Sequence, residues 1–168
     1  LSSRLCPSLV QVQAWPDTLP AVRKAVEEQV KAKLPTGRFD VLTSNSSVVL
    51  PSGPGRFLIE SAKPEQETVL RSKISSDIGA VTGLTHSRVV VRVGGPKAAW
   101  LLATGIGLDF ALVAFPAATV QLTHHHEIGL TVHRVDEETF ELYAFTSYAR
   151  GLWHWLPTAA GEVGYEVA

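Results

Sequence analysis

Short stretches in which apolar and polar side chains alternate recur along the 168 residues, and turns rich in Gly or Pro separate several of them. A period of two is typical of a β-strand with one buried face, because successive side chains point to opposite faces of a sheet. Residues 9–15 show this period first, and residues 88–93 show it most strongly, with Val89, Val91 and Val93 on one face. The chain is therefore expected to be built on short strands.

Apolar residues at helical spacing fill segments between these strands. Thr18 is expected to cap a helix that carries one apolar stripe and ends at Pro35-Thr36-Gly37, and Pro64 opens a second helix that runs through about Ile74. The stripe of the first helix consists of Leu19, Val22, Val26 and Val30. Two further helices are expected, one after Gly94-Gly95-Pro96 and one capped by Ser147.

The order of the segments predicts an α+β fold with two successive halves, β-α-β-β-α-β and then β-α-β-β-β-α. The remaining expected strands cover residues 48–50, 56–61, 79–84, 119–123, 128–135 and 139–145. No Gly/Ser linker lies near residues 75–86. We therefore expect one domain, residues 1–168, made of two packed subdomains, about 1–82 and 83–168, that share an interface.

Charge and composition exclude several classes of function. Fifteen Lys and Arg against sixteen Asp and Glu give a formal charge of −1, which argues against a nucleic-acid partner. The lone Cys6 excludes an internal disulfide and fits a cytoplasmic protein. No apolar run approaches the roughly 20 residues that cross a bilayer, so no membrane is expected. The chain starts at Leu1 and contains no Met, so we expect further residues before Leu1 in the translated protein.

The run His124-His125-His126 is the strongest metal candidate in the sequence. On a strand, His124 and His126 would point the same way and could hold a metal with help from Glu127. Glu127 would face oppositely on an unbroken strand, however, and the run lies where a hairpin has to turn. We favour a solvated strand end and assign no metal site.

His86 and Ser87 have the residue types of a catalytic pair, but adjacent residues on a strand point apart and cannot share a hydrogen bond. No Gly-x-Ser-x-Gly elbow accompanies them. Gly105-Ile106-Gly107 and Gly53-Pro54-Gly55 are too short for a dinucleotide-binding fingerprint. We assign no catalytic residue and no cofactor-binding residue to this chain.

Four stretches together form a recognisable pattern. They are residues 6–12 (CPSLVQV), 53–59 (GPGRFLI), 76–102 (from Ser76-Asp77-Ile78-Gly79 to Gly94-Gly95-Pro96-Lys97-Ala98-Ala99-Trp100-Leu101-Leu102) and 147–156 (SYARGLWHWL). In this order and spacing they resemble the gamma subunits of heterotetrameric sarcosine oxidase across nearly the whole chain. The middle stretch is also similar to the folate-binding fold of the glycine-cleavage aminomethyltransferase.

The resemblance implies that the chemistry sits in other chains. It implies a large alpha subunit that binds NAD and folate, a beta subunit that carries FAD and covalent FMN, and a small zinc-binding delta subunit. For this chain it implies a noncatalytic role in supporting the assembly that demethylates sarcosine. Two alternatives stay open: the equivalent subunit of a related flavin dehydrogenase acting on another secondary, N-methylated or cyclic amino acid, and a stand-alone folate-binding module.

A folate site in this chain would need a carboxylate for the pterin ring and an aromatic surface for stacking. By residue type, the candidates are Asp77, Asp109, Trp100 and Tyr143. On the last helix, Trp153 and Trp155 lie about 200 degrees apart. One of the two could face outward as an anchor for a partner, or the segment after Pro157 could fold back and cover it.

Overall fold

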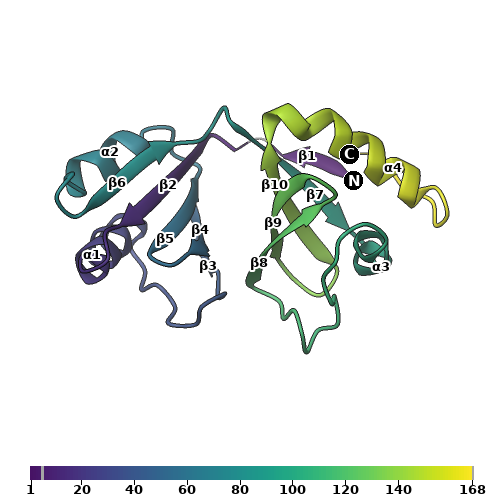
Figure 1. Ribbon diagram of the computed structural model, residues 1–168, viewed down its shortest axis with the longest axis horizontal. Helices are drawn as coiled ribbons and strands as arrows, with labels where there is room; N and C mark the ends of the chain where they lie inside the picture. The colour runs from purple at the N-terminus through teal and green to yellow at the C-terminus, as the bar shows by residue number, and fades with distance from the viewer. Residues whose placement is uncertain (5, 168) are drawn as a thin grey trace. The chain divides into compact units, whose positions relative to one another are not determined.

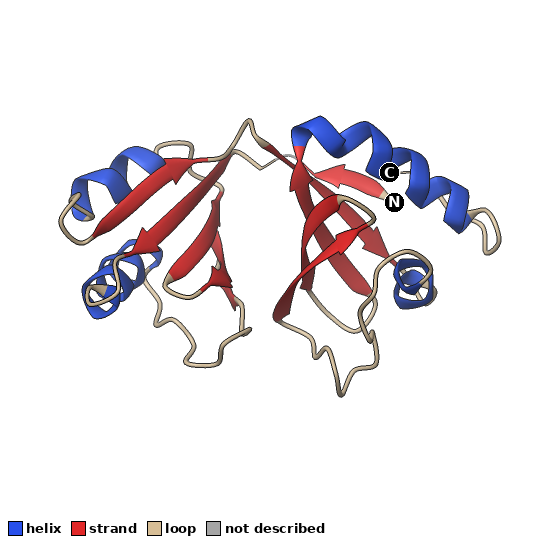
Figure 2. Cartoon of the chain, viewed as in Figure 1, coloured by secondary structure: helices blue, strands red, loops and turns tan. Residues whose placement is uncertain are grey.

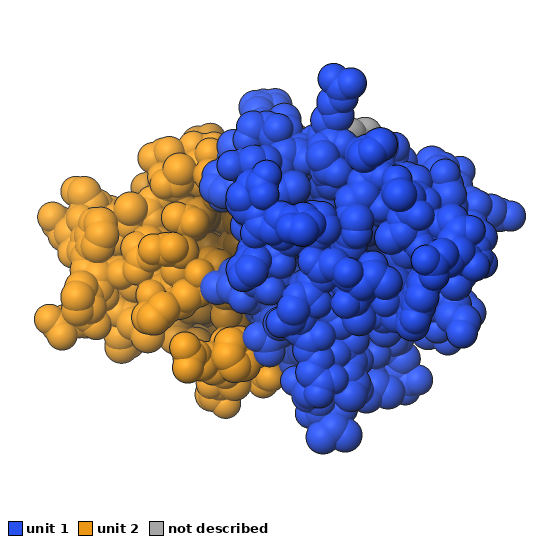
Figure 3. All heavy atoms as spheres, turned by 45° about the vertical axis from the view of Figure 1, so that its right-hand side comes forward, with its two compact units in different colours: residues 1–5, 86–168 blue, residues 6–85 orange. Residues whose placement is uncertain are grey.

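The computed structural model describes residues 1–4 and 6–167, and the chain divides into two compact units (Figure 3). Unit 1 comprises residues 1–5 and 86–168, and unit 2 comprises residues 6–85. No helix in the described part is long and apolar enough to cross a membrane.

Unit 2 is an antiparallel sheet with helices on one face (Figures 1 and 2). Its elements are β2 (Ser8–Ala14), α1 (Leu19–Val30), β3 (Leu42–Thr43), β4 (Ser47–Gly53), β5 (Arg56–Ser61), α2 (Gln66–Lys73) and β6 (Gly79–Gly83). The strands lie in the order β3-β4-β5-β2-β6. The alternation along β2 places Val10 and Val12 against Val22 and Val26 of α1 and Leu70 of α2. This contact forms the apolar core of unit 2.

Unit 1 repeats this architecture with its own core. Its elements are β1 (Ser2–Arg4), β7 (Arg88–Gly94), α3 (Ala98–Ala103), β8 (Thr119–His125), β9 (Ile128–Arg134), β10 (Thr139–Phe145), a 3-10 turn (Thr146–Tyr148) and α4 (Ala149–Ala160). The strands lie in the order β1-β7-β10-β9-β8, all antiparallel. The core joins Val91 and Val93 of β7 to Leu102 of α3 and Leu152 and Leu156 of α4.

The two sheets have the same strand order once β1 is included, although β1 is connected differently. In unit 2, β6 follows the second helix and pairs with β2 at one edge of the sheet. In unit 1, the corresponding place beside β7 is taken by β1, which comes from the start of the chain. The predicted α+β fold is confirmed, and the two predicted element orders are found with one added strand in each unit, β3 in unit 2 and β1 in unit 1. The sequence did not predict β1 or β3, which are short and carry no apolar alternation.

Several helix ends differ from the sequence-based expectation. α2 begins at Gln66, two residues after Pro64, and Thr18 lies at the N-cap of α1 without a side-chain cap hydrogen bond. α1 ends at Val30, before Pro35-Thr36-Gly37, because Lys31 adopts the left-handed conformation with φ 57°. Ser147 does not cap the last helix, because it lies inside the 3-10 turn, and α4 begins after Tyr148 with no side-chain cap. Pro157 lies inside α4, which continues to Ala160.

Each sheet also buries side chains on the face opposite its helices, which we call the second face. In unit 2, Leu9, Leu50 and Leu58 are buried there, outside the cluster that packs on α1 and α2. That face also buries Glu60, and in unit 1 the second face buries Glu141 and His133. On the second face of unit 1, Glu141 has several charged and polar partners.

Candidate functional site

The centre of the candidate site is Glu141, in the middle of β10. Its neighbours Phe140 and Leu142 point into the core, so Glu141 points to the second face of the unit 1 sheet. The strand register places Arg92 of β7 directly opposite it on one side and His133 of β9 on the other. The carboxylate is only 3% exposed.

Two arginines and a tyrosine hold this carboxylate. Arg4 Nε lies 2.9 Å from Glu141 Oε1, and Arg4 Nη2 donates to Oε2 at 3.2 Å. Arg92 Nη2 donates to Oε1 at 2.5 Å. The Tyr143 hydroxyl donates to Oε2 at 3.1 Å, and His133 Nδ1 lies 3.5 Å from the same oxygen. We call these residues the Glu141 cluster; Arg4 brings β1 into it from the start of the chain.

The cluster keeps Glu141 ionised. Burial disfavours the charged form, but the interactions with His133 and Arg92 and the positive charge of Arg4 outweigh it and lower the pKa of Glu141 to about 2. A general acid or base works best when its pKa lies near the working pH. Glu141 is therefore a fixed anion at neutral pH, suited to holding strands together and unsuited to moving protons.

The histidine run is divided by the turn between β8 and β9. β8 ends at His125, and His126 has a φ of 48° in the turn with Glu127, so His124 and His126 do not share an unbroken strand. His125 is buried, stacks on Trp155 with ring centroids 3.9 Å apart, and has Nδ1 2.8 Å from the Gly105 carbonyl oxygen. Among the described residues, no group of three or more His, Cys, Asp or Glu could hold a metal.

The four candidates for folate binding lie on four different elements. Asp77 is exposed in the turn before β6 of unit 2, and Trp100 is 42% exposed on α3. Asp109 accepts a hydrogen bond from the Ala111 amide in the loop after α3. Tyr143 is buried in the Glu141 cluster. The three candidates in unit 1 therefore lie on separate elements of that unit: a helix, a loop and a strand of the sheet.

His86 and Ser87 lie where the chain enters β7. The His86 and Ser87 carbonyl oxygens accept hydrogen bonds from Thr146, at its hydroxyl and its amide respectively. Next to them, the Arg88 guanidinium lies 3.5 Å from the centroid of the Phe145 ring. These main-chain contacts join the start of β7 to the end of β10, which is a structural role.

Trp153 and Trp155 are both half-buried and both pack on the unit 1 core. Trp155 contacts His125, and Trp153 lines a shallow hollow on the outer surface of α4 together with Arg150 and Pro157. The segment after α4 lines a different cavity. Neither alternative predicted for this pair describes it fully, because both rings are partly covered by their own unit.

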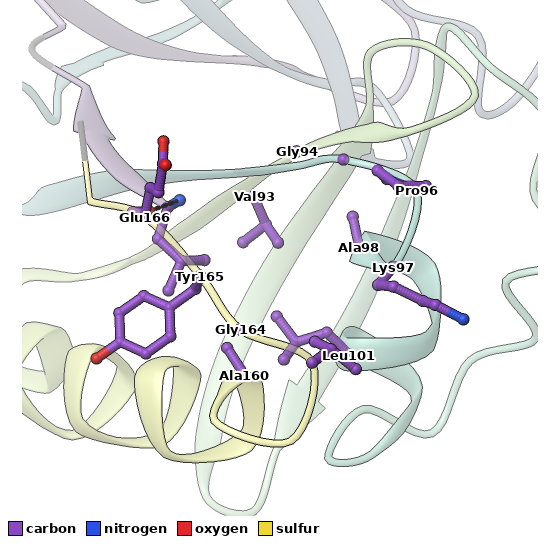
Figure 4. A pocket seen from close by; sticks show the side chains of 13 residues that line it. Val93, Gly94, Pro96, Lys97, Ala98, Leu101, Ala160, Gly164, Tyr165 and Glu166 are labelled. Carbon is purple, nitrogen blue, oxygen red and sulfur yellow. Dashed lines mark hydrogen bonds between the residues drawn. The ribbon is translucent and has the colours of Figure 1, made fainter.

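That other cavity lies between the end of β7, the start of α3 and the C-terminal segment (Figure 4). Its volume is about 280 Å³, and its walls include Val93, Pro96, Lys97, Leu101 and Tyr165. None of the predicted folate candidates lines it. Its walls are mainly apolar and also include the polar side chains of Lys97, Tyr165 and Glu166.

Sequence reasoning did not select Glu141, Arg4 or His133 as site residues. Along β10, Glu141 alternates with apolar neighbours in the way that a solvent-facing residue does, and Arg4 is 137 positions away in sequence. One signal was present: Val91 and Val93 were predicted to share one face of their strand, which leaves Arg92 for the opposite face, and the structure confirms this placement.

No protein-family model and no curated protein sequence matches the chain. Its structure is similar to solved structures. One is a chain of heterotetrameric sarcosine oxidase from Corynebacterium sp. U-96 in complex with pyrrole 2-carboxylate, with a TM-score of 0.84, 24% identity, and coverage of 96% of this chain and 83% of that chain. Another is the glycine cleavage system aminomethyltransferase T from Bartonella henselae, with a TM-score of 0.69 and 17% identity. The alignment covers 99% of this chain but only 46% of that enzyme.

The fold therefore belongs to the class that the aminomethyltransferase represents. Within that class, a chain of heterotetrameric sarcosine oxidase is similar in both fold and length. The predicted resemblance is confirmed at the level of fold. Sequence identities of 24% and 17% do not extend it to a shared function.

Proposed function

We propose that this chain is a noncatalytic, gamma-type subunit of a heterotetrameric sarcosine oxidase and supports the assembly of the subunits that demethylate sarcosine. The observation that carries this proposal is the two-way coverage: the match takes in 96% of this chain and 83% of a chain from a sarcosine oxidase heterotetramer. The aminomethyltransferase, in contrast, is matched over less than half of its length. This difference in coverage favours a small chain within a larger assembly over a shortened aminomethyltransferase.

The chemistry of the described residues supports a structural role. The buried carboxylate of Glu141 has a pKa of about 2 and is held by two arginines. Such a group stabilises a sheet and does not exchange protons at neutral pH. Under this proposal FAD, FMN, NAD, tetrahydrofolate and zinc reside on alpha, beta and delta subunits, and the complex works in the cytoplasm.

Coexpression tests the proposal directly. The tagged chain would be produced together with the products of its neighbouring genes and purified through the tag. We expect yellow, flavin-bearing subunits to copurify and the complex to oxidise sarcosine. A colourless chain that purifies alone in the presence of expressed flavoprotein partners would contradict the proposal.

A related flavin dehydrogenase would give the same copurification, because its amine pocket also lies on another subunit. Activity of the purified complex on sarcosine, N-methylproline and cyclic imino acids separates the two.

The likeness to the aminomethyltransferase fold supports a second candidate function, a stand-alone folate-binding module. Calorimetry of the isolated chain with tetrahydrofolate tests it. Saturable binding, with no partner that copurifies, would favour this function over the subunit role.

A further inference from the structure

The loop between α3 and β8 extends beyond the end of the unit 1 sheet (Figure 1), and its tip is apolar. Four consecutive residues are exposed there: Ala111, Leu112, Val113 and Ala114. The exposed fraction is 45% for Leu112 and 96% for Val113. No other large hydrophobic residue in the described chain is as exposed as Val113. We call residues 111–114 the apolar tip.

A buried arginine fixes both ends of the apolar tip by hydrogen bonds. Arg134, at the end of β9, is 3% exposed, and its Nη1 donates to the carbonyl oxygens of Phe110 and Phe115, both at 2.8 Å. These two residues flank the tip. The other nitrogens of Arg134 donate to the carbonyl oxygens of Asp136 and Glu137, at 3.2 and 2.6 Å. One guanidinium thus ties both ends of the tip to the turn between β9 and β10.

Aromatic packing fixes the same loop. The rings of Phe110 and Phe115 have centroids 5.5 and 6.2 Å from that of Phe140 in the core. Within the tip, the amides of Ala114 and Phe115 donate to the Ala111 carbonyl oxygen, which closes a helical turn. The tip is therefore preorganised, so binding through it would cost little loop-ordering entropy.

The sequence around the tip defines the kind of partner. Residues 110–123 contain no ionisable side chain, and no Lys or Arg lies between Lys97 and Arg134. A nucleic acid or an anionic membrane surface would call for basic residues beside the tip. The uncharged run continues from the tip into β8, the edge strand of the unit 1 sheet, which has no second strand neighbour in the described chain. A neutral apolar tip next to free strand-edge amides and carbonyls fits a protein surface.

We propose that the apolar tip is a docking element that inserts Leu112 and Val113 into an apolar pocket of a larger subunit of the complex. This inference rests on the proposed function and names the surface through which the chain would join its partner. An exposed apolar pair that a buried arginine and two phenylalanines hold in place has the properties of an interface anchor.

The test uses the full chain coexpressed with its flavin-bearing partner subunits. Val113→Asp should lower the flavin retained per mole of tagged chain by roughly tenfold or more, because a central interface residue contributes that much or more. The matched control is Val167→Asp, since Val167 is 59% exposed on the C-terminal segment. It should retain the wild-type amount. A photo-crosslinking residue at position 113 should attach to a partner subunit.

The outcomes separate this inference from the proposed function. If the wild-type chain retains no flavoprotein, the proposed function and the docking inference both fail. If the wild-type chain and Val113→Asp retain equal flavin, only the docking inference fails. Concentration-dependent dimerisation of the isolated chain that Val113→Asp abolishes would assign the tip to a second copy and overturn the inference. Flotation of the isolated chain with phosphatidylcholine vesicles would overturn it in favour of a lipid surface.

Discussion

Replacing Glu141 by Gln is the most direct test of the Glu141 cluster. The ordinary glutamate pKa of 4.5 falls to about 2 in the folded chain. Since each pH unit corresponds to about 1.4 kcal/mol, this difference makes the ionised carboxylate worth about 3 kcal/mol of unfolding free energy at neutral pH. Arg92 has a side chain that is 45% exposed, so solvent screening makes this figure an upper value.

The sign of the pH dependence follows from the lowered pKa. A carboxyl group with a depressed pKa contributes its full stabilisation above pH 4.5 and loses it as the pH falls towards 2. The stability difference between the wild type and Glu141→Gln should therefore shrink from about 3 kcal/mol at pH 7 to about 1 kcal/mol at pH 3. Other carboxyl groups titrate in both proteins, and their effects cancel in the difference.

Urea unfolding followed by circular dichroism at both pH values measures this difference. Glu127→Gln is the matched control, because Glu127 is exposed in the turn after β8, and it should change stability by less than about 0.5 kcal/mol. A penalty for Glu141→Gln that is the same at pH 7 and pH 3 would refute the electrostatic reasoning. So would a Glu141 carboxyl that titrates near pH 4.5 in a carbon-13 NMR experiment.

Two further substitutions test other contacts of unit 1. Arg134→Met should destabilise the chain by roughly 2–4 kcal/mol in urea unfolding, because the carbonyl oxygens of Phe110 and Phe115 lose a buried donor. Protease cleavage within residues 111–114 should also rise. Unchanged cleavage would show that the arginine does not hold the tip. Gly105→Ala should lower thermal stability by about 1–3 kcal/mol, since a Cβ there would lie 2.5 Å from Trp155 and 2.8 Å from His125. Gly129→Ala serves as the control, because a Cβ at that position would meet open space. Equal melting temperatures for the two variants would contradict the packing argument.

The strands were predictable because their buried face repeats every two residues. The predicted strand 139–145 coincides with β10, and the valines of β7 lie on the predicted face. β1 was missed for a physical reason: its residues Ser2, Ser3 and Arg4 contain no apolar position, so the strand exists only through its pairing with β7. Such pairing joins residues almost 90 positions apart and leaves no local pattern.

The Glu141 cluster was unpredictable for a related reason. A polar residue that alternates with apolar residues predicts a solvated face, and nothing local indicates that the second face of this sheet is buried. The charges of Arg4, Arg92 and Glu141 become one network only after β1, β7 and β10 are placed side by side. Histidine has the same ambiguity: His125 was read with a solvated strand end, but its burial comes from Trp155, which lies 30 positions further along the chain.

The position of β1 links the stability of unit 1 to the start of the chain. Unit 2 obtains its strand beside β2 from the segment that follows α2, but unit 1 obtains the matching strand from residues 2–4, with all of unit 2 between them and β7. One edge strand of the unit 1 sheet is therefore supplied by the start of the sequence, whereas its other strands come from the second half. Arg4 adds an ion pair to the backbone pairing of β1 with β7, because without Arg4 the carboxylate of Glu141 would be buried with one guanidinium fewer. A change in residues 2–4 should therefore destabilise unit 1 before unit 2, although all of unit 2 lies between these residues and β7 in the sequence.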